Sequence, residues 1–236
     1  MDASHQSARL EKARAALAAV QSRVGTTRSV TGVECWETPV LPLAATLSDA
    51  LPTGLRRGQV VAVQGSTSLV LALVAEASRE GSWTAMIGMP QVGVVAAARR
   101  GIELSRLALI PHPGAQAPAV AGACVDGMDV VVLGPRLALA DADRRRLVAR
   151  ARERGAVIVS AGSWEGAHVT LTVESSRWRG LGAGDGRLRE REMTVAMSSR
   201  AGGQVRRVLL TLDVDTGLRR ESRDSVGQPA ALEGAA

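Results

Sequence analysis

The segment "VVAVQGSTSLVLALVAEA" (60–77) contains residue types that could bind a phosphate group. An apolar run ends at a glycine, and small hydroxyl residues lead from it directly into an apolar helix. This is the setting of a phosphate-binding loop, in which backbone N–H groups surround the phosphates and a lysine neutralises them. Such a loop requires the pattern GxxxxGK[ST]. Here the second glycine is absent and Lys12 is the only lysine in the chain. We therefore expect a degenerate remnant that binds no nucleotide, made of Gly65, Ser66, Thr67 and Ser68.

The acidic residues that an ATPase needs are also missing at the ends of the apolar segments. In "DVVVLGP" (129–135), Gly134 stands where a metal-binding aspartate would follow the strand, and Asp129 lies at the opposite end, as a turn or strand-start residue. The segment "MIGMP" offers no carboxylate to activate water. The three histidines and two cysteines are scattered, without the spacing of a zinc site. We expect no catalytic residue, no cofactor and no metal.

The basic residues are unevenly distributed along the chain. The formal net charge is +6, and the surplus is concentrated between residues 177 and 207. A basic face can contact nucleic acid or an acidic protein, and a neighbouring tryptophan could stack on a base. The simpler interpretation, an arginine-rich hairpin tip in water, is favoured over this one. The candidate contact residues are Arg177, Trp178, Arg179, Arg187, Arg189 and Arg191.

Apolar segments alternate with helical patterns across the centre of the chain. Such alternation predicts a mostly parallel sheet covered by helices on both faces. Beyond residue 162 three segments alternate between apolar and polar residues, which predicts an antiparallel meander. The fold class expected is therefore α/β. The predicted parallel strands are 59–64, 83–89, 107–111, 129–134 and 156–162; the helices are 67–79, 91–100, 115–125 and 141–154; the meander strands are 168–178, 187–198 and 205–214.

The chain divides into three predicted parts: an N-terminal helix and linker (1–35), a core (36–215) and a polar tail expected to be disordered (216–236). The helix, 8–24, spaces Leu10, Ala13, Leu17 and Val20 as a partner-binding face would. Folding back onto the chain's own core is an equally good interpretation. No signal peptide or run of membrane-spanning length is visible, so we expect a cytoplasmic protein with reduced cysteines.

The order of these elements resembles the RecA recombinase core. The resemblance runs from about residue 8 to 214 and rests on "LSDALPTGLRRGQVVAVQGS", "TSLVLALVAEASREGSWTAMIGM", "GIELSRLALIP", "DVVVLGP" and "HVTLTVESSRWRGLGAGDGRLREREMTVAM". It implies a RecA-like sheet with residues 65–68 at the phosphate-loop position, Pro90 near the catalytic glutamate and Gly134 at the metal-binding aspartate. The segments that form RecA's DNA-binding loops are too short here, which argues against RecA-like strand binding.

A RecA-like fold with degenerate nucleotide motifs resembles the ImuA/SulA-like group, and most closely the actinobacterial ImuA-prime proteins. That resemblance rests on "RRGQVVAVQGSTSLVLALVAEASREGSW", "RLVARARERGAVIVSAGSW" and "RWRGLGAGDGRLR". It implies a non-catalytic scaffold of mutagenic translesion synthesis, induced by DNA damage in the SOS response. The implied partners are an ImuB-like homologue of Y-family polymerases and an error-prone C-family polymerase complex, with RecA or DNA as further candidates and no membrane. A SulA-like inhibitor of the division GTPase FtsZ, a basic nucleic-acid-binding protein and a residual ATPase remain as alternatives.

Overall fold

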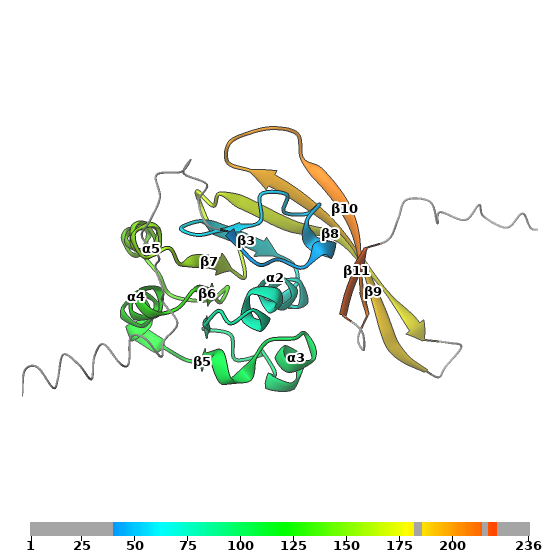
Figure 1. Ribbon diagram of the computed structural model, residues 1–236, viewed down its shortest axis with the longest axis horizontal. Coiled ribbons are helices and arrows are strands. Elements are labelled where there is room, and N and C mark those ends of the chain that lie inside the picture. Colours follow the sequence, from blue (N-terminus) through cyan, green and yellow to red (C-terminus); the bar gives the residue numbers. More distant parts are fainter. Residues whose placement is uncertain (1–39, 182–185, 214–216, 221–236) are drawn as a thin grey trace, which may run out of the picture. The chain divides into compact units, whose positions relative to one another are not determined.

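A computed structural model describes residues 40–181, 186–213 and 217–220, all within the unit Thr38–Ala236. These residues form one nine-stranded mixed sheet with helices packed against it, and a separate two-stranded ribbon (Figure 1). The strand order in the large sheet is β11-β10-β9-β8-β3-β7-β6-β4-β5. The predicted N-terminal helix, with Leu10, Ala13, Leu17 and Val20, lies outside the described residues.

The parallel part of the sheet is built from short strands, and all of them except the edge strand at residues 107–110 are buried along nearly their whole length. This pattern arises because helices cover both faces, so that inward-facing and outward-facing positions are both apolar. The strands are β3 (Val60–Gln64), β4 (Thr84–Ile87), β5 (Leu107–Ile110), β6 (Val130–Leu133) and β7 (Val157–Ser160). Strand β3 pairs in parallel with β7 and with the start of β8.

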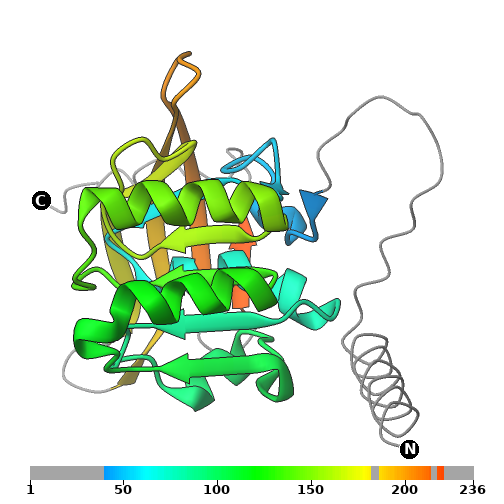
Figure 2. The same ribbon diagram turned by 90° about the vertical axis from the view of Figure 1, so that its left-hand side faces the viewer.

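Two helices pack on each face of this sheet (Figures 1 and 2). Helices α2 (Thr67–Arg79) and α3 (Val94–Arg99) lie on one face, and α4 (Ala117–Gly127) and α5 (Asp141–Arg154) lie on the other. Alternate residues of one strand serve different cores: Val61 and Val63 pack toward α2, whereas Val60 and Ala62 pack toward α4 and α5. Short 3-10 helices are η1 (Ala45–Leu47), η2 (Leu104–Arg106) and η3 (Gly114–Gln116).

The antiparallel part continues the sheet beyond β3 as a meander. Its strands are β8 (Val169–Leu181), β9 (Gly186–Ser199), β10 (Arg206–Asp213) and β11 (Gly217–Arg220), and each pairs with the next. Strands β8 and β9 form the long hairpin at the right of Figure 1. Strand β11 lies within the segment 216–236 that was expected to be disordered, so that expectation is wrong for these four residues.

The predicted fold class is confirmed: the chain is α/β, with a mostly parallel sheet between helices and a C-terminal antiparallel meander that extends it. Before β3, the described chain contains η1 and the small ribbon of β1 (Val40–Leu41) and β2 (Leu55–Arg56). In the part of the chain that the structure describes, no helix has both the length and the apolar character needed to cross a bilayer.

Candidate functional site

The loop remnant sits between the carboxyl end of β3 and the start of α2, where a phosphate-binding loop would lie. Ser66 caps α2: its hydroxyl oxygen accepts a hydrogen bond from the Leu69 N–H at 3.2 Å. Gly65 has φ of 87°, a conformation that favours glycine. A Cβ atom at this position would lie 3.3 Å from Cβ of Val173. The side of the loop that faces β8 is therefore closed by a neighbouring strand.

The other side of the loop is closed by β9. The Ser66 hydroxyl donates to Sδ of Met193 at 3.7 Å and accepts from Nη1 of Arg191 at 3.3 Å. Nη2 of Arg191 donates to the hydroxyl oxygen of Ser176 at 3.2 Å. The Arg191 guanidinium thus lies at the N-terminus of α2. There the Ser66 oxygen accepts hydrogen bonds from both the Leu69 N–H and Arg191. Side chains of β8 and β9 therefore pack directly against the loop remnant at the N-terminus of α2.

The position of the missing metal-binding aspartate is sterically closed. A Cβ atom on Gly134 would lie 2.0 Å from the carbonyl oxygen of Gly88 and 2.6 Å from its carbonyl carbon. Backbone contact between the ends of β4 and β6 is this close because the Gly134 N–H donates to the Ile87 carbonyl oxygen at 2.8 Å. Any side chain at residue 134 would have to push these two strand ends apart.

The space beside Gly134 is also filled by side chains. The cavity bordered by Gly134, Ser163 and Trp164 has a volume of about 10 Å³, which is room for no more than one water molecule. The Arg144 guanidinium covers the Trp164 ring at 4.8 Å from its centroid, a cation–π contact. Within the described ranges, no three His, Cys, Asp or Glu side chains form a cluster that could hold a metal ion.

The arginine hairpin is divided by the pleat of the sheet. Trp178 lies opposite Arg191 on the paired strand, and the Arg191 guanidinium is 5.7 Å from its ring centroid. Directly opposite residues share a face, and alternation along β9 adds Arg187 and Arg189 to this one. Arg177 and Arg179 project from the other face, where Arg179 forms an ion pair with Glu192. The six predicted contact residues therefore do not form a single surface.

One consequence of this geometry could not be read from the sequence. Arg191 belongs to the predicted arginine group and Ser66 to the predicted loop remnant, and the two are hydrogen-bonded across 125 positions of the chain. The loop remnant and the arginine hairpin are thus neighbours, and Arg191, the most buried of the hairpin's predicted contact arginines, packs against the loop.

The model of the MT3502 N-terminal domain family matches residues 49–166, which is half of the 236-residue chain. The chain belongs to this family. It is also similar to the uncharacterized protein Rv3395c of Mycobacterium tuberculosis, at 42% identity over 129 residues. That match covers 53% of this chain and 62% of the mycobacterial protein. The MT3502 match includes the loop remnant and Gly134, and it ends before the β8–β9 hairpin.

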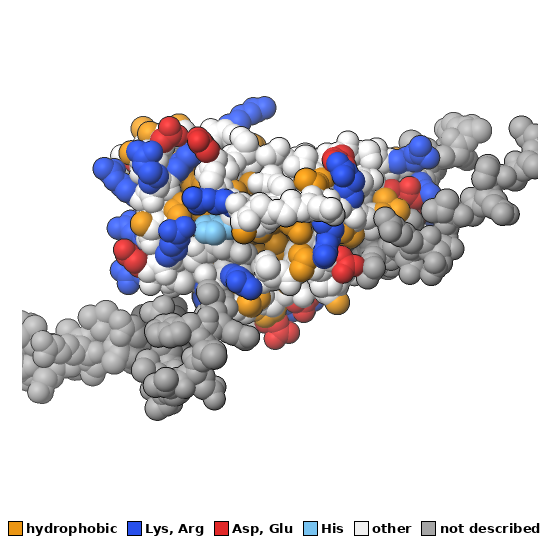
Figure 3. All heavy atoms as spheres, turned by 90° about the horizontal axis from the view of Figure 1, so that it is seen from above, with side chains coloured by type: hydrophobic (Ala, Val, Ile, Leu, Met, Phe, Trp, Pro, Cys, Tyr) orange, Lys and Arg blue, Asp and Glu red, His pale blue; other side chains and the backbone are white. Residues whose placement is uncertain are grey.

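A second group of basic residues, which the sequence analysis did not predict, lies at the amino ends of the parallel strands. Arg56, Arg152, His168 and Arg200 line one cleft there, although they come from β2, α5, the start of β8 and the β9–β10 turn. Figure 3 looks onto this face and shows basic side chains around a histidine. Because the residues are far apart in sequence, no local motif could have identified them.

His168 gives this cleft a pH-dependent contribution to stability. Burial, together with the nearby Arg152 and Arg200, lowers the pKa of His168. The unfolded chain therefore binds the proton first, so stability is complete above the ordinary histidine pKa of about 6.5 and decreases as the pH falls below it. We expect His168→Asn to flatten this acid-side decrease, measured as the free energy of unfolding between pH 7.5 and 5.5. The same exchange at exposed His112 is the control, and an equally steep decrease in both variants would contradict the expectation.

Proposed function

We propose that this protein is a non-catalytic scaffold of mutagenic translesion synthesis, induced by DNA damage, that acts by binding an ImuB-like partner. The observation that carries the proposal is the nucleotide position, where Val173, Arg191 and Met193 fill the loop and a Gly88 carbonyl excludes any side chain at residue 134. A RecA-like fold that keeps its core but has no open nucleotide site would function by binding a partner protein at its surface.

The resemblance of three segments to the ImuA-prime proteins supports the proposed pathway. A mycobacterial relative at 42% identity agrees with an actinobacterial family. The implied assembly contains the ImuB-like homologue of Y-family polymerases and an error-prone C-family polymerase complex, in the cytoplasm. The Cys124 thiol fits a non-catalytic role, because burial raises its pKa and so disfavours the reactive thiolate.

The first test is affinity purification of the tagged protein from its own host, with and without DNA damage, followed by mass spectrometry. We expect an ImuB-like protein among the recovered partners after damage. Recovery of FtsZ in its place would favour the SulA-like division inhibitor and overturn the scaffold proposal. Failure to recover an ImuB-like protein after damage would also count against it.

A matched variant separates scaffolding from a residual ATPase. Thr67 and Ser68 are the first two residues of α2, and their hydroxyls could stand at the metal-binding position of a phosphate loop. Neither of them is the residue that caps the helix, which is Ser66. We expect Thr67→Ala with Ser68→Ala to recover the same partners as the wild-type protein. Loss of the partners, together with an ATP-dependent thermal shift of the wild-type protein, would show that nucleotide binding controls the interaction.

A further inference from the structure

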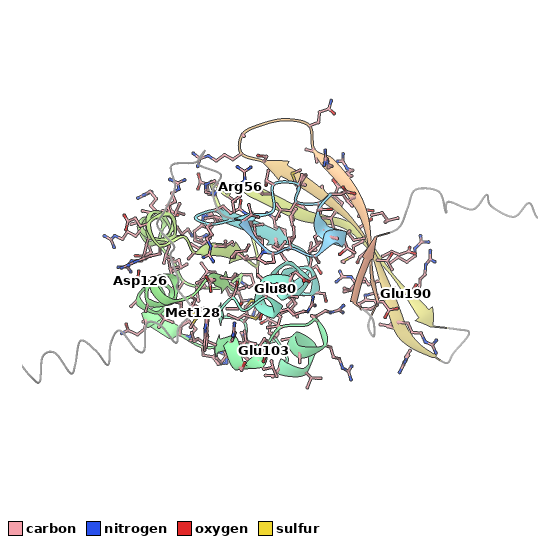
Figure 4. All side chains as sticks on the ribbon, in the orientation of Figure 1. Arg56, Glu80, Glu103, Asp126, Met128 and Glu190 are labelled. Atoms are coloured by element: carbon pink, nitrogen blue, oxygen red, sulfur yellow. The ribbon has the colours of Figure 1, made fainter. Side chains whose placement is uncertain are left out.

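The cleft at the amino ends of the parallel strands is unusually cationic. Its volume is about 780 Å³, and none of the described residues that line it is an aspartate or glutamate. In Figure 4, Arg56 lies near the top of the view, well above Glu80 and Glu103. Four arginines line the cleft, namely Arg56, Arg57, Arg152 and Arg200.

Only one of these four arginines is neutralised within the described chain. Arg57 donates through both terminal nitrogens to Oδ1 of Asp129, each at 2.9 Å. Arg56, Arg152 and Arg200 form no ion pair with any described residue. Elsewhere on the same helix, Arg150 and Arg154 both pair with Asp126 of α4. Asp126 therefore neutralises arginines on the side of α5 that faces α4, whereas no described carboxylate pairs with Arg152 on the side that faces the cleft.

The contact between Arg152 and His168 brings two hydrogen-bond donors together. Nδ1 of His168 accepts the Val60 N–H at 3.0 Å, so the ring proton is on Nε2. Nε2 lies 3.3 Å from Nη2 of Arg152, which can only donate. The backbone N–H of Arg200 donates to the His168 carbonyl oxygen at 3.0 Å, which fixes the turn beside them. An acceptor placed in the cleft would satisfy both facing donors at once.

We propose that this cleft binds phosphate groups, with Arg56, Arg152 and Arg200 as the charged contacts and His168 Nε2 as a neutral donor. The source of the phosphate is either the backbone of a single-stranded nucleic acid or a free phosphate compound. Guanidinium forks match phosphate oxygens, and in an uncharged histidine one ring nitrogen still donates. This site is distinct from the RecA-like nucleotide position, which lies at the opposite ends of the strands.

The number of donors favours phosphate over the carboxylates of an acidic peptide. Three guanidinium groups, the His168 Nε2–H and the Ser199 hydroxyl face the cleft. The Ser199 oxygen already accepts from the Ala201 N–H, so its hydrogen remains available to donate. One carboxylate offers two oxygens, whereas a terminal phosphate offers three and successive phosphodiesters offer more. The three cations project into the cleft from three separate elements, so successive phosphates of one nucleic-acid strand could each contact a different arginine.

The test compares the double variant Arg152→Gln with Arg200→Gln against a charge-matched control, Arg145→Gln with Arg99→Gln. Both control residues are exposed, on α5 and α3, and lie outside the cleft and outside the arginine hairpin. The probe is a fluorescent oligothymidylate of about 20 nucleotides, long enough to exceed one small binding site. We expect the cleft variant to bind at least about tenfold more weakly and its salt slope to fall by about 1.4, from two lost phosphate contacts.

A second pair of variants separates charge from packing. Arg152→Lys with Arg200→Lys keeps both charges but loses the planar forks, so we expect the wild-type salt slope with weaker binding. Circular dichroism of every variant shows whether the fold is retained. Loss of affinity in the outer control as large as in the cleft variant would overturn the proposal, because binding would then depend on net charge alone.

Two further probes distinguish the source of the anion. If inorganic phosphate stabilises the wild-type protein against heat, fails to stabilise the cleft variant, and oligonucleotide binding is the same in both, the site is a phosphate site that serves free phosphate. If a polyglutamate peptide loses affinity in the cleft variant while neither phosphate probe does, the phosphate proposal is wrong and the cleft binds an acidic protein. Unchanged binding of all three probes would also overturn it.

Discussion

Gly134→Asp, which places an acid where the RecA resemblance puts the metal-binding aspartate, is expected to destabilise the protein by about 3 kcal/mol and to confer no ATP binding. The reason is steric: the new Cβ atom would lie 2.0 Å from the Gly88 carbonyl oxygen, and the clash is with backbone, which cannot rotate away. The ends of β4 and β6 would have to separate, with loss of the 2.8 Å bond from the Gly134 N–H to the Ile87 carbonyl oxygen. Urea unfolding of the purified variant measures the loss.

The same exchange at Gly93 is the matched control. Gly93 is the N-cap of α3, and a Cβ atom there would meet nothing within 4 Å. Because aspartate is a favoured N-cap residue, we expect Gly93→Asp to stay within about 0.5 kcal/mol of the wild type. A Gly134→Asp protein with wild-type stability and an Mg²⁺-ATP-dependent thermal shift would show that the nucleotide site is only dormant, and the scaffold proposal would lose its main support.

The elements themselves were predictable because local sequence determines them. Helix α2 spans Thr67–Arg79 as predicted, since Ser66 caps its start and Gly81 follows its end. Helix α5 also has its predicted bounds: acidic residues begin it, and Gly155 ends it with φ of 70°. Periodicity predicted the meander for the same reason, because three alternating segments each bury one face.

The closure of the loop could not be predicted in this way. The sequence shows that residues 65–68 are too few to surround a phosphate, but Val173 and Arg191, which fill the space, come from strands more than 100 positions away. The pairing register decides which hairpin arginines reach the loop, and the bulge between Val173 and Ser175 sets that register. A local sequence pattern contains no information on the pairing register or on the position of the bulge.

The basic cleft was hidden for a related reason. The arginines of α5 are close together in the sequence, yet packing gives them different partners. Arg144 covers Trp164, Arg150 and Arg154 pair with Asp126, and Arg152 contacts His168. Figure 4 shows Asp126 between the two helices. Only the tertiary arrangement shows which arginine is left without a carboxylate.

Asp129→Ala is expected to lose about 2 kcal/mol of stability, because this carboxylate joins three segments at the amino end of the sheet. Its Oδ1 accepts both terminal nitrogens of Arg57 at 2.9 Å, and its Oδ2 accepts the Trp83 N–H at 3.0 Å. The structure therefore gives Asp129 a structural role, as its place at the strand start suggested. Asp129→Asn keeps one acceptor for Arg57 and is expected to lose less; equal losses would show that hydrogen bonding to Oδ1 is unimportant.

The same variant links the fold to the cleft. Arg57 lines the cleft but is neutralised by Asp129, so Asp129→Ala adds an unpaired cation there while it destabilises the protein. At a temperature at which both proteins are folded, we therefore expect Asp129→Ala to bind the oligothymidylate more tightly than the wild type, with a steeper salt dependence. Simple damage to the fold would weaken binding instead. Opposite changes in stability and affinity would thus separate a charge gained at the cleft from damage to the fold, whereas parallel losses would contradict the assignment of the cleft.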